Sequence, residues 1–189
     1  MCQLQQWPVA DCHGSAVRPI GRRQFVKLAA MGGAAALLGS FLPRTAHAAG
    51  GTEALLLSCM DYRLVDDTER FMAGKGMREK YDHIVLAGAS LGALTSKFPA
   101  WNAAFWEHLD VAISLHHIKR VMVLDHRDCG AYKVVLGEDF GKMPEQETRV
   151  HAETLMALRK AILQKHPQLQ VESYLMALDG RVEQIVPRA

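Results

Sequence analysis

The sequence predicts an α/β domain with a mostly parallel central β-sheet, flanked by helices and closed by a C-terminal antiparallel edge hairpin. Short and almost wholly apolar runs are typical of strands that are buried on both faces. These runs alternate with longer segments of helical periodicity, as in parallel sheets whose strands are joined by crossover helices. The last two runs are joined by Asp179-Gly180, a dipeptide typical of two-residue hairpin loops.

The first half of the domain contains two predicted strands and one predicted helix. The run "ALLLS" (54–58) is apolar throughout and predicts a buried strand. The segment 66–80 has acidic residues in its first turn and basic residues near its end, which matches the helix dipole. The run "HIVLAG" (83–88) predicts the second strand, which ends at Gly88.

The second half contains two predicted helices and three predicted strands. Residues 104–117 and 145–165 place apolar side chains on one helical face, and "RVMVLD" (120–125) predicts a strand between them. The final strands are predicted at 169–178 and 181–186.

The first 48 residues contain the three parts of an export signal. A twin arginine stands in "GRRQFVK" (21–27), a weakly apolar run of 15 residues follows (28–42), and "PRTAHA" ends in a small-x-small cleavage pattern at Ala48. That run is shorter than the roughly 20 residues that cross a bilayer as a helix. The leader (1–48) resembles a twin-arginine (Tat) signal peptide. This implies export by the Tat machinery to the periplasm or another extracytoplasmic space, and a buried N-terminal helix is the alternative.

Cleavage after Ala48 leaves one domain of 141 residues (49–189). The chain has 22 Lys and Arg and 20 Asp and Glu, but five of these basic residues and one acidic residue lie in the leader. The mature domain therefore has a net charge of −2. We expect it to bind neither nucleic acid nor an anionic membrane, because its basic character belongs to the leader.

Two of the four cysteines, Cys59 and Cys129, lie in the mature domain. In an exported protein, two thiols would ordinarily suggest a disulfide. However, Cys59 follows the first predicted strand, and His126 and Cys129 follow the third. Because parallel strands end at one edge of the sheet, these three side chains can meet there. Two thiolates and one imidazole suit Zn²⁺, with a fourth tetrahedral position left for water.

The segments "CMDYR" (59–63) and "HRDCG" (126–130) resemble, in the right order, the two signatures of the β-class carbonic anhydrases. Residues 107–133 are similar to the helix, strand and ligand segment of that family, and residues 171–186 to its closing hairpin. The resemblance spans most of residues 54–186 and implies a β-carbonic anhydrase-like fold.

The resemblance also implies an activity and a role for each motif residue. Cys59, His126 and Cys129 would bind one Zn²⁺ per chain, and zinc-bound hydroxide would convert CO2 reversibly to bicarbonate. Asp61 would accept the hydrogen bond of that hydroxide, and a bidentate salt bridge from Arg63 would hold Asp61 away from the metal. In an extended chain Cys59, Asp61 and Arg63 would point the same way. An ordinary surface ion pair is the alternative for Asp61 and Arg63.

The sequence also departs from the family pattern. "VLAG" (85–88) stands where the family usually has Arg-Asn-Ala-Gly, and few residues precede the first strand of the mature domain, where family members have helices that embrace a partner. Trp101, Phe105 and Trp106 are interpreted as core or interface packing, with a pocket lining as the alternative, and they predict at least a homodimer. Two other functions remain open: hydrolysis of carbonyl sulfide or carbon disulfide at the same site, and zinc binding without catalysis.

Overall fold

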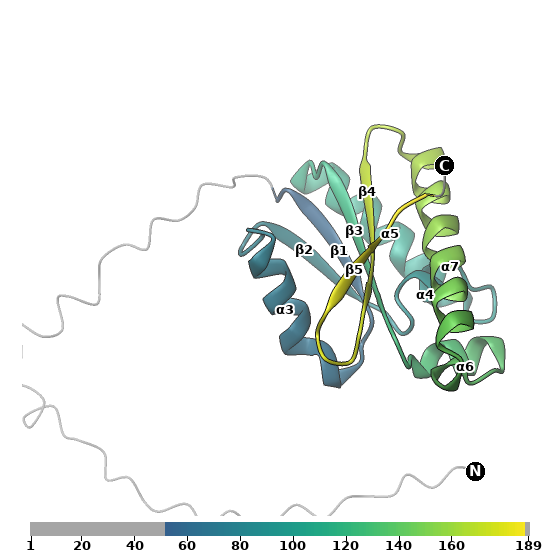
Figure 1. The fold of residues 1–189 in the computed structure, drawn as a ribbon. Coiled ribbons are helices and arrows are strands. Elements are labelled where there is room, and N and C mark those ends of the chain that lie inside the picture. Colours follow the sequence, from purple (N-terminus) through teal and green to yellow (C-terminus); the bar gives the residue numbers. More distant parts are fainter. Residues whose placement is uncertain (1–51, 188–189) are drawn as a thin grey trace, which may run out of the picture. The chain divides into compact units, whose positions relative to one another are not determined.

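The computed structural model describes residues 52–187, so the predicted leader and its cleavage site lie outside the described residues. The strands form a five-stranded sheet in the order β2-β1-β3-β4-β5 (Figure 1). The strands are β1 (Ala54–Ser58), β2 (Tyr81–Val85), β3 (Arg120–His126), β4 (Gln170–Met176) and β5 (Val182–Ile185). The helices are α3 (Val65–Gly74), α4 (Ser90–Leu94), α5 (Pro99–His116), α6 (Gly130–Leu136) and α7 (Pro144–Lys165), with 3-10 turns η2 (Tyr62–Leu64) and η3 (Phe140–Lys142).

The strand directions confirm the predicted fold class. β1 pairs in parallel with β2 and with β3, and β3 pairs in parallel with β4. β5 pairs antiparallel with β4 and forms one edge of the sheet, as predicted for the closing hairpin.

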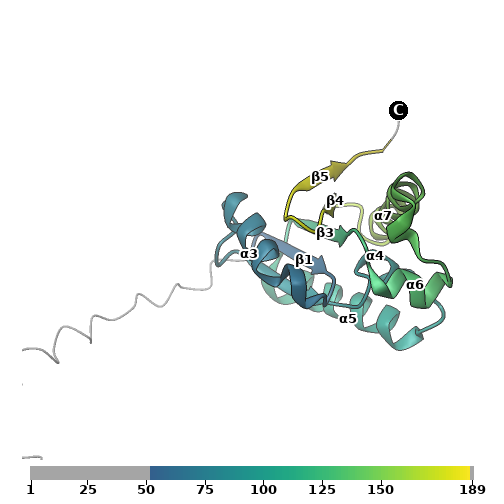
Figure 2. The ribbon, with the colours of Figure 1, turned by 60° about the horizontal axis from the view of Figure 1, so that its bottom comes forward.

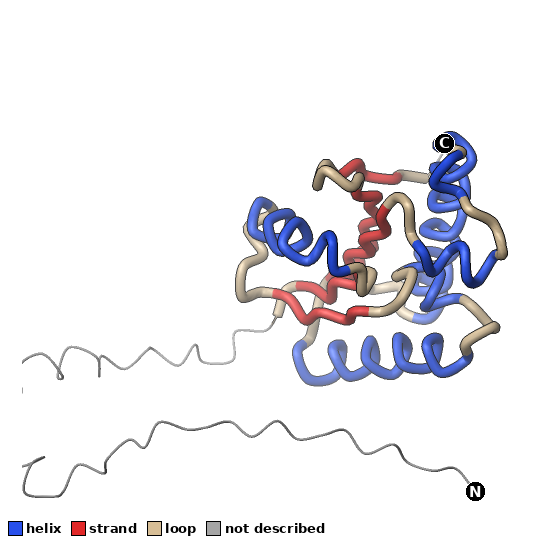
Figure 3. Tube along the Cα trace, turned by 90° about the horizontal axis from the view of Figure 1, so that it is seen from below, coloured by secondary structure: helices blue, strands red, loops and turns tan. Residues whose placement is uncertain are grey.

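Helices cover both faces of the sheet, which explains why β1 and the middle of β3 are almost wholly apolar. On one face, side chains of β1 and β3 such as Leu57 and Val123 pack against α4, α5 and α7. On the other face, alternate residues such as Leu56 and Met122 pack against α3. Figures 1 and 3 show α3 on one side of the strands and α5 and α7 on the other.

The helix predicted over 66–80 is wrong in its second half, because α3 ends at Gly74. Gly76 adopts a left-handed backbone with φ +72°. Its N–H donates to the carbonyl of Ala73, and the N–H of Met77 donates to the carbonyl of Met72. These two bonds form a Schellman motif, which terminates a helix by satisfying its last carbonyl groups.

The predicted two-residue hairpin loop is also wrong. The N–H of Ala177 donates to the carbonyl of Arg181, and the N–H of Gly180 donates to the carbonyl of Ala177. Three residues therefore form the loop, with Gly180 in the left-handed conformation at φ +81°. This is the hairpin in which a type I turn is followed by a residue with positive φ.

The aromatic residues expected at an interface lie in three different environments. Phe105 is completely buried in the subunit core, so core packing is the correct alternative for this residue and it is not part of an interface surface. Trp106 is partly buried against that core, and Trp101 stacks on Phe98.

Within residues 52–187, none of the helices has the length and apolar character that crossing a bilayer requires.

Candidate metal centre

The three predicted metal ligands converge at the carboxyl end of the sheet. Cys59 directly follows β1, His126 is the last residue of β3, and Cys129 precedes the first turn of α6. β1 and β3 are parallel neighbours, with Ser58 opposite Leu124, so their ends bring Cys59 and His126 together. The ligand atoms of the three residues all lie within 4.8 Å of one another. Figure 2 shows this end of the sheet with α4 and α6 beside it.

The loop between His126 and Cys129 is held from outside. Asp128 adopts a left-handed backbone with φ +54°, which is uncommon for a residue other than glycine. Its N–H donates to Oε1 of the buried Glu147 at 2.6 Å, and the N–H of Arg127 donates to the carbonyl of Met176 at 2.9 Å. Helix α7 and strand β4 thereby set the position of the loop between the two ligands.

His126 has the hydrogen-bonding pattern of a metal ligand. Its Nδ1–H donates to the carbonyl of Arg127 at 2.8 Å, because a carbonyl can only accept. This leaves Nε2 as an acceptor, and among residues 52–187 the buried Nε2 has no hydrogen-bond partner. A buried polar atom with no partner is costly unless a ligand satisfies it, so His126 fits a metal ion at this position.

The two cysteines are free thiols and their sulfur atoms lie 3.8 Å apart. This is much longer than a disulfide bond. It agrees with the separation of about 3.8 Å between two sulfurs that are each about 2.3 Å from a tetrahedral zinc ion. The sulfur spacing and the unpaired Nε2 of His126 therefore both fit Zn²⁺.

The cluster favours a thiolate at Cys59 even without a metal. The hydrogen bond from Cys129 lowers the pKa of the Cys59 thiol to about 4, against the opposing effect of burial, and His126 and the N–H of Gly88 lower it further. Sharing a hydrogen with Cys59 raises the pKa of Cys129. Burial lowers the pKa of His126, but its proximity to the charged sulfur of Cys59 outweighs burial and raises it.

Asp61 and Arg63 form the bidentate pair that the sequence predicted. Nε of Arg63 donates to Oδ1 of Asp61 at 3.0 Å, and Nη2 donates to Oδ2 at 2.8 Å. These hydrogen bonds lower the pKa of the Asp61 carboxyl and raise the pKa of the Arg63 guanidinium. Asp61 also lies next to the proposed ligands, because its Oδ2 is 3.8 Å from Nε2 of His126.

The local backbone differs from the extended chain that the prediction assumed. Asp61 caps the 3-10 turn η2, and its Oδ1 accepts the backbone N–H of Arg63 at 3.0 Å. Arg63 also donates to Oδ2 of Asp128 at 2.9 Å and to the Asp128 carbonyl at 3.0 Å. This second anchor joins the arginine to the loop between His126 and Cys129, and it was not predicted from the sequence.

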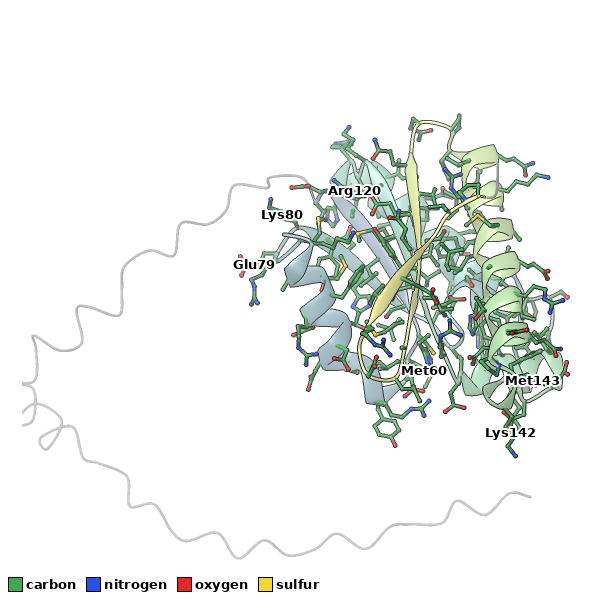
Figure 4. All side chains as sticks on the ribbon, viewed as in Figure 1. Met60, Glu79, Lys80, Arg120, Lys142 and Met143 are labelled. Atoms are coloured by element: carbon green, nitrogen blue, oxygen red, sulfur yellow. The ribbon has the colours of Figure 1, made fainter. Side chains whose placement is uncertain are left out.

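An open and mostly apolar pocket of ≈330 Å³ adjoins the cluster. Its lining includes Cys59 and Asp61, and the rest comes from Met60, Tyr62, Ala87, Trp101, Ala131 and Val134. Met60 and Tyr62 are 64% and 85% exposed, although both are large and largely apolar. Figure 4 labels Met60 at the lower end of the sheet, where the ligand segments lie.

The segment "VLAG" (85–88), which departs from the family pattern, contributes to this site through its backbone. Ala87 lines the pocket, and the N–H of Gly88 donates to Sγ of Cys59 at 3.3 Å.

A further polar cluster around Asp125 and His151 lies behind the ligands and was not predicted from the sequence. The signal was present, because Glu147 and His151 continue the buried face of α7 that includes Leu155.

This fold and this cluster of side chains define a class of protein, the carbonic anhydrase type, in which two cysteines and one histidine that could hold a metal ion meet at the carboxyl end of a parallel sheet. Residues 49–186 match a family model described as "Putative carbonic anhydrase". The chain belongs to this carbonic anhydrase family, which confirms the resemblance that the two motifs indicated.

Similar proteins include two from rickettsiae, both called uncharacterized. The protein of Rickettsia bellii (strain RML369-C) is 42% identical over 134 residues, covering 71% of this chain and 82% of the relative. That of Rickettsia conorii (strain ATCC VR-613 / Malish 7) is 42% identical over 131 residues, covering 69% of this chain and 70% of the relative.

Two solved structures have the same fold at low sequence identity. A carbonic anhydrase from Glaciozyma antarctica has a TM-score of 0.51 and 18% identity, covering 80% of this chain and 92% of that chain. A β-carbonic anhydrase from Trichomonas vaginalis has a TM-score of 0.51 and 15% identity, covering 88% of this chain and 98% of that chain.

Proposed function

We propose that this protein binds one Zn²⁺ through Cys59, His126 and Cys129 and reversibly hydrates CO2 to bicarbonate. The observation that carries the proposal is the unpaired Nε2 of His126, buried beside two free thiols. Membership of the carbonic anhydrase family and the proximity of the three ligand atoms support it. When bound, zinc supplies a water molecule whose pKa is lowered to about 7.

Asp61 would orient the attacking oxygen. Its carboxylate lies at the edge of the cluster and stays ionised, because the hydrogen bonds from Arg63 lower its pKa. An ionised carboxylate can only accept a hydrogen bond, so Asp61 would direct a lone pair of the attacking oxygen toward the pocket. Arg63 would hold Asp61 in this role through two hydrogen bonds.

The pocket would receive the substrate. Its lining is apolar apart from a few groups that include Asp61, which suits a small linear molecule without net charge. The same character suits carbonyl sulfide and carbon disulfide, so hydrolysis of these substrates remains the second candidate.

We also propose that a second copy of the chain covers this pocket. Met60, Tyr62 and Val134 are 64%, 85% and 56% exposed and surround an opening that one subunit leaves unshielded. Exposed large apolar side chains that gather in one place are typical of interfaces. The N-terminal leader would bring the protein to the Tat machinery and then to the periplasm or another extracytoplasmic space.

Assays of the purified, zinc-loaded protein against CO2 and carbonyl sulfide test the proposal. We expect CO2 hydration in stopped-flow measurements, and none from a His126→Ala variant treated with zinc in the same way. Faster turnover of carbonyl sulfide would favour the hydrolase instead. One bound zinc per chain with neither activity would mean a zinc-binding protein without catalysis.

A further inference from the structure

Behind the proposed ligands lies a cluster of polar side chains with almost no contact with solvent. It consists of Asp125, Ser90, Tyr132 and His151, none of which is more than 2% exposed. Asp125 lies in β3 directly before His126, and the others come from α4, α6 and α7. None of the four lines the apolar pocket next to Asp61.

The carboxylate of Asp125 accepts four hydrogen bonds. Oδ1 accepts the backbone N–H of Ser90 at 3.0 Å. Oδ2 accepts the hydroxyl groups of Ser90 and Tyr132, both at 2.6 Å, and Nδ1–H of His151 at 2.9 Å. A buried carboxylate with this many donors has one low-energy position, because moving it would leave buried donors without partners. Asp125 thereby joins four secondary-structure elements at a fixed point.

One of these hydrogen bonds holds a strained turn. Between β2 and α4 the chain passes through Gly88 with φ +73° and Ala89 with φ +37°. Positive φ is unfavourable for alanine, so outside contacts have to hold the turn in place. The bond from the N–H of Ser90 to Asp125 holds its end.

This turn directs a hydrogen bond at a proposed metal ligand. The N–H of Gly88 donates to Sγ of Cys59 at 3.3 Å. Gly88 also packs closely on α6, since a Cβ at this position would lie 3.1 Å from Cβ of Ala131. The position of the turn therefore depends on Asp125 on one side and on the helix after Cys129 on the other.

We propose that Asp125 is a positioning residue of the metal centre: through Ser90 it sets the turn whose Gly88 N–H binds the Cys59 sulfur, and through Tyr132 it orients the helix that follows Cys129. This rests on the zinc-binding part of the proposed function and is independent of the substrate. Groups that orient metal ligands from outside typically change metal affinity by about 10- to 100-fold when they are replaced.

Asp125→Asn tests the proposal with little change in volume. Its amide N–H2 group would take the place of Oδ2, where three donors converge, or else would face the N–H of Ser90. We expect zinc affinity, measured against a chromophoric chelator, to fall about 10- to 100-fold. The sulfur-to-metal charge-transfer band of the Co²⁺-loaded protein should also shift, because hydrogen bonds to a thiolate change its electron donation to the metal.

Milder variants and matched controls separate positioning from stability. Ser90→Ala and Tyr132→Phe each remove one hydroxyl from the cluster, and both should lower zinc affinity. These two variants carry the test if Asp125→Asn fails to fold. Ser173→Ala is the matched serine control, because Ser173 is buried in β4 and its hydroxyl has no partner in the described part of the chain. Tyr174→Phe is the tyrosine control, because Tyr174 donates to Glu172 instead. Both controls should keep the affinity and the Co²⁺ band.

Failure of this inference and failure of zinc binding have different signatures. If the unaltered protein binds no zinc, the proposed function fails. If it binds zinc and the folded cluster variants keep the same affinity and the same Co²⁺ band, the positioning role of Asp125 is wrong. A lower melting temperature alone, with both metal readouts unchanged, would also contradict it, because that is the result of a purely structural role.

Discussion

Replacing Arg63 with alanine tests how the carboxylate next to the metal centre is held. The substitution removes two hydrogen bonds to Asp61 and two to Asp128. Of its contacts with residue 63, Asp61 would then keep only the hydrogen bond from the backbone N–H at that position to its Oδ1, and its Oδ2 already lies 3.8 Å from Nε2 of His126. We expect Asp61 to occupy the fourth position of bound zinc and to exclude the attacking water.

The contacts of Arg63 indicate the size of the effect. Its side chain is 36% exposed, and those of Asp61 and Asp128 are 14% and 50% exposed, so solvent weakens both ion pairs. A partly exposed pair contributes about 0.5–1 kcal/mol, and two such pairs about 1–2 kcal/mol. This corresponds to roughly a 5- to 30-fold change in an equilibrium constant. We therefore expect CO2 hydration to fall by about tenfold at neutral pH.

Zinc content should stay near one per chain in the same variant. The loop between His126 and Cys129 loses Arg63, but the Asp128 N–H still donates to Glu147 and the Arg127 N–H still donates to Met176. Atomic absorption would measure the metal, and the Co²⁺ d–d spectrum would distinguish water from carboxylate as the fourth ligand.

Two further variants serve as controls for this experiment. Arg63→Lys keeps the positive charge but lacks the planar fork, so it should lie between the unaltered protein and Arg63→Ala. Adding Asp61→Ala to Arg63→Ala should restore the spectrum of a water ligand without restoring full activity. Full activity of Arg63→Ala, or a spectrum that still indicates water, would refute the reasoning.

Four further predictions can be checked independently. Replacing any one of the three proposed ligands should release the zinc, and the unaltered mature domain, denatured and chelated, should show two free thiols; a disulfide would show none. Arg22→Lys together with Arg23→Lys should leave an uncleaved precursor in the cytoplasm in a fractionation experiment, and normal export would contradict the Tat assignment. Light scattering at micromolar concentration should find at least a dimer with an interface above ~1,000 Å², and Tyr62→Asp should dissociate it; a monomeric unaltered protein would exclude this. The hydrogen bond from Lys165 lowers the pKa of Asp110, so Asp110 stabilises the fold above pH ~4 and loses this effect as the pH falls. Asp110→Asn should therefore lower the melting temperature more at pH 7 than at pH ~2, below the usual pKa of aspartate, and an equal difference at both values would contradict the assignment.

The sequence alone determined the fold class, the family, and the order along the chain of the five strands and the three longer helices, but not the short helices α4 and α6. Apolar runs that alternate with helical segments predict a parallel sheet, because only strands covered on both faces are apolar throughout. The two motifs could also be recognised from the sequence, since the residues of each motif are close neighbours in the chain. Parallel strand ends meet at one edge, so the proximity of Cys59 to these residues also followed from the fold class.

The tertiary structure decided the contacts between residues that are distant in the sequence. Arg63 reaches Asp128, and Asp125 binds Ser90 and His151, only because strand register and helix packing bring separate segments together. No local periodicity encodes such pairs. Phe105 shows the same limit: its helical spacing indicated a buried face, but only the packing of α5 on the sheet decided that this face lies in the subunit core and not between subunits.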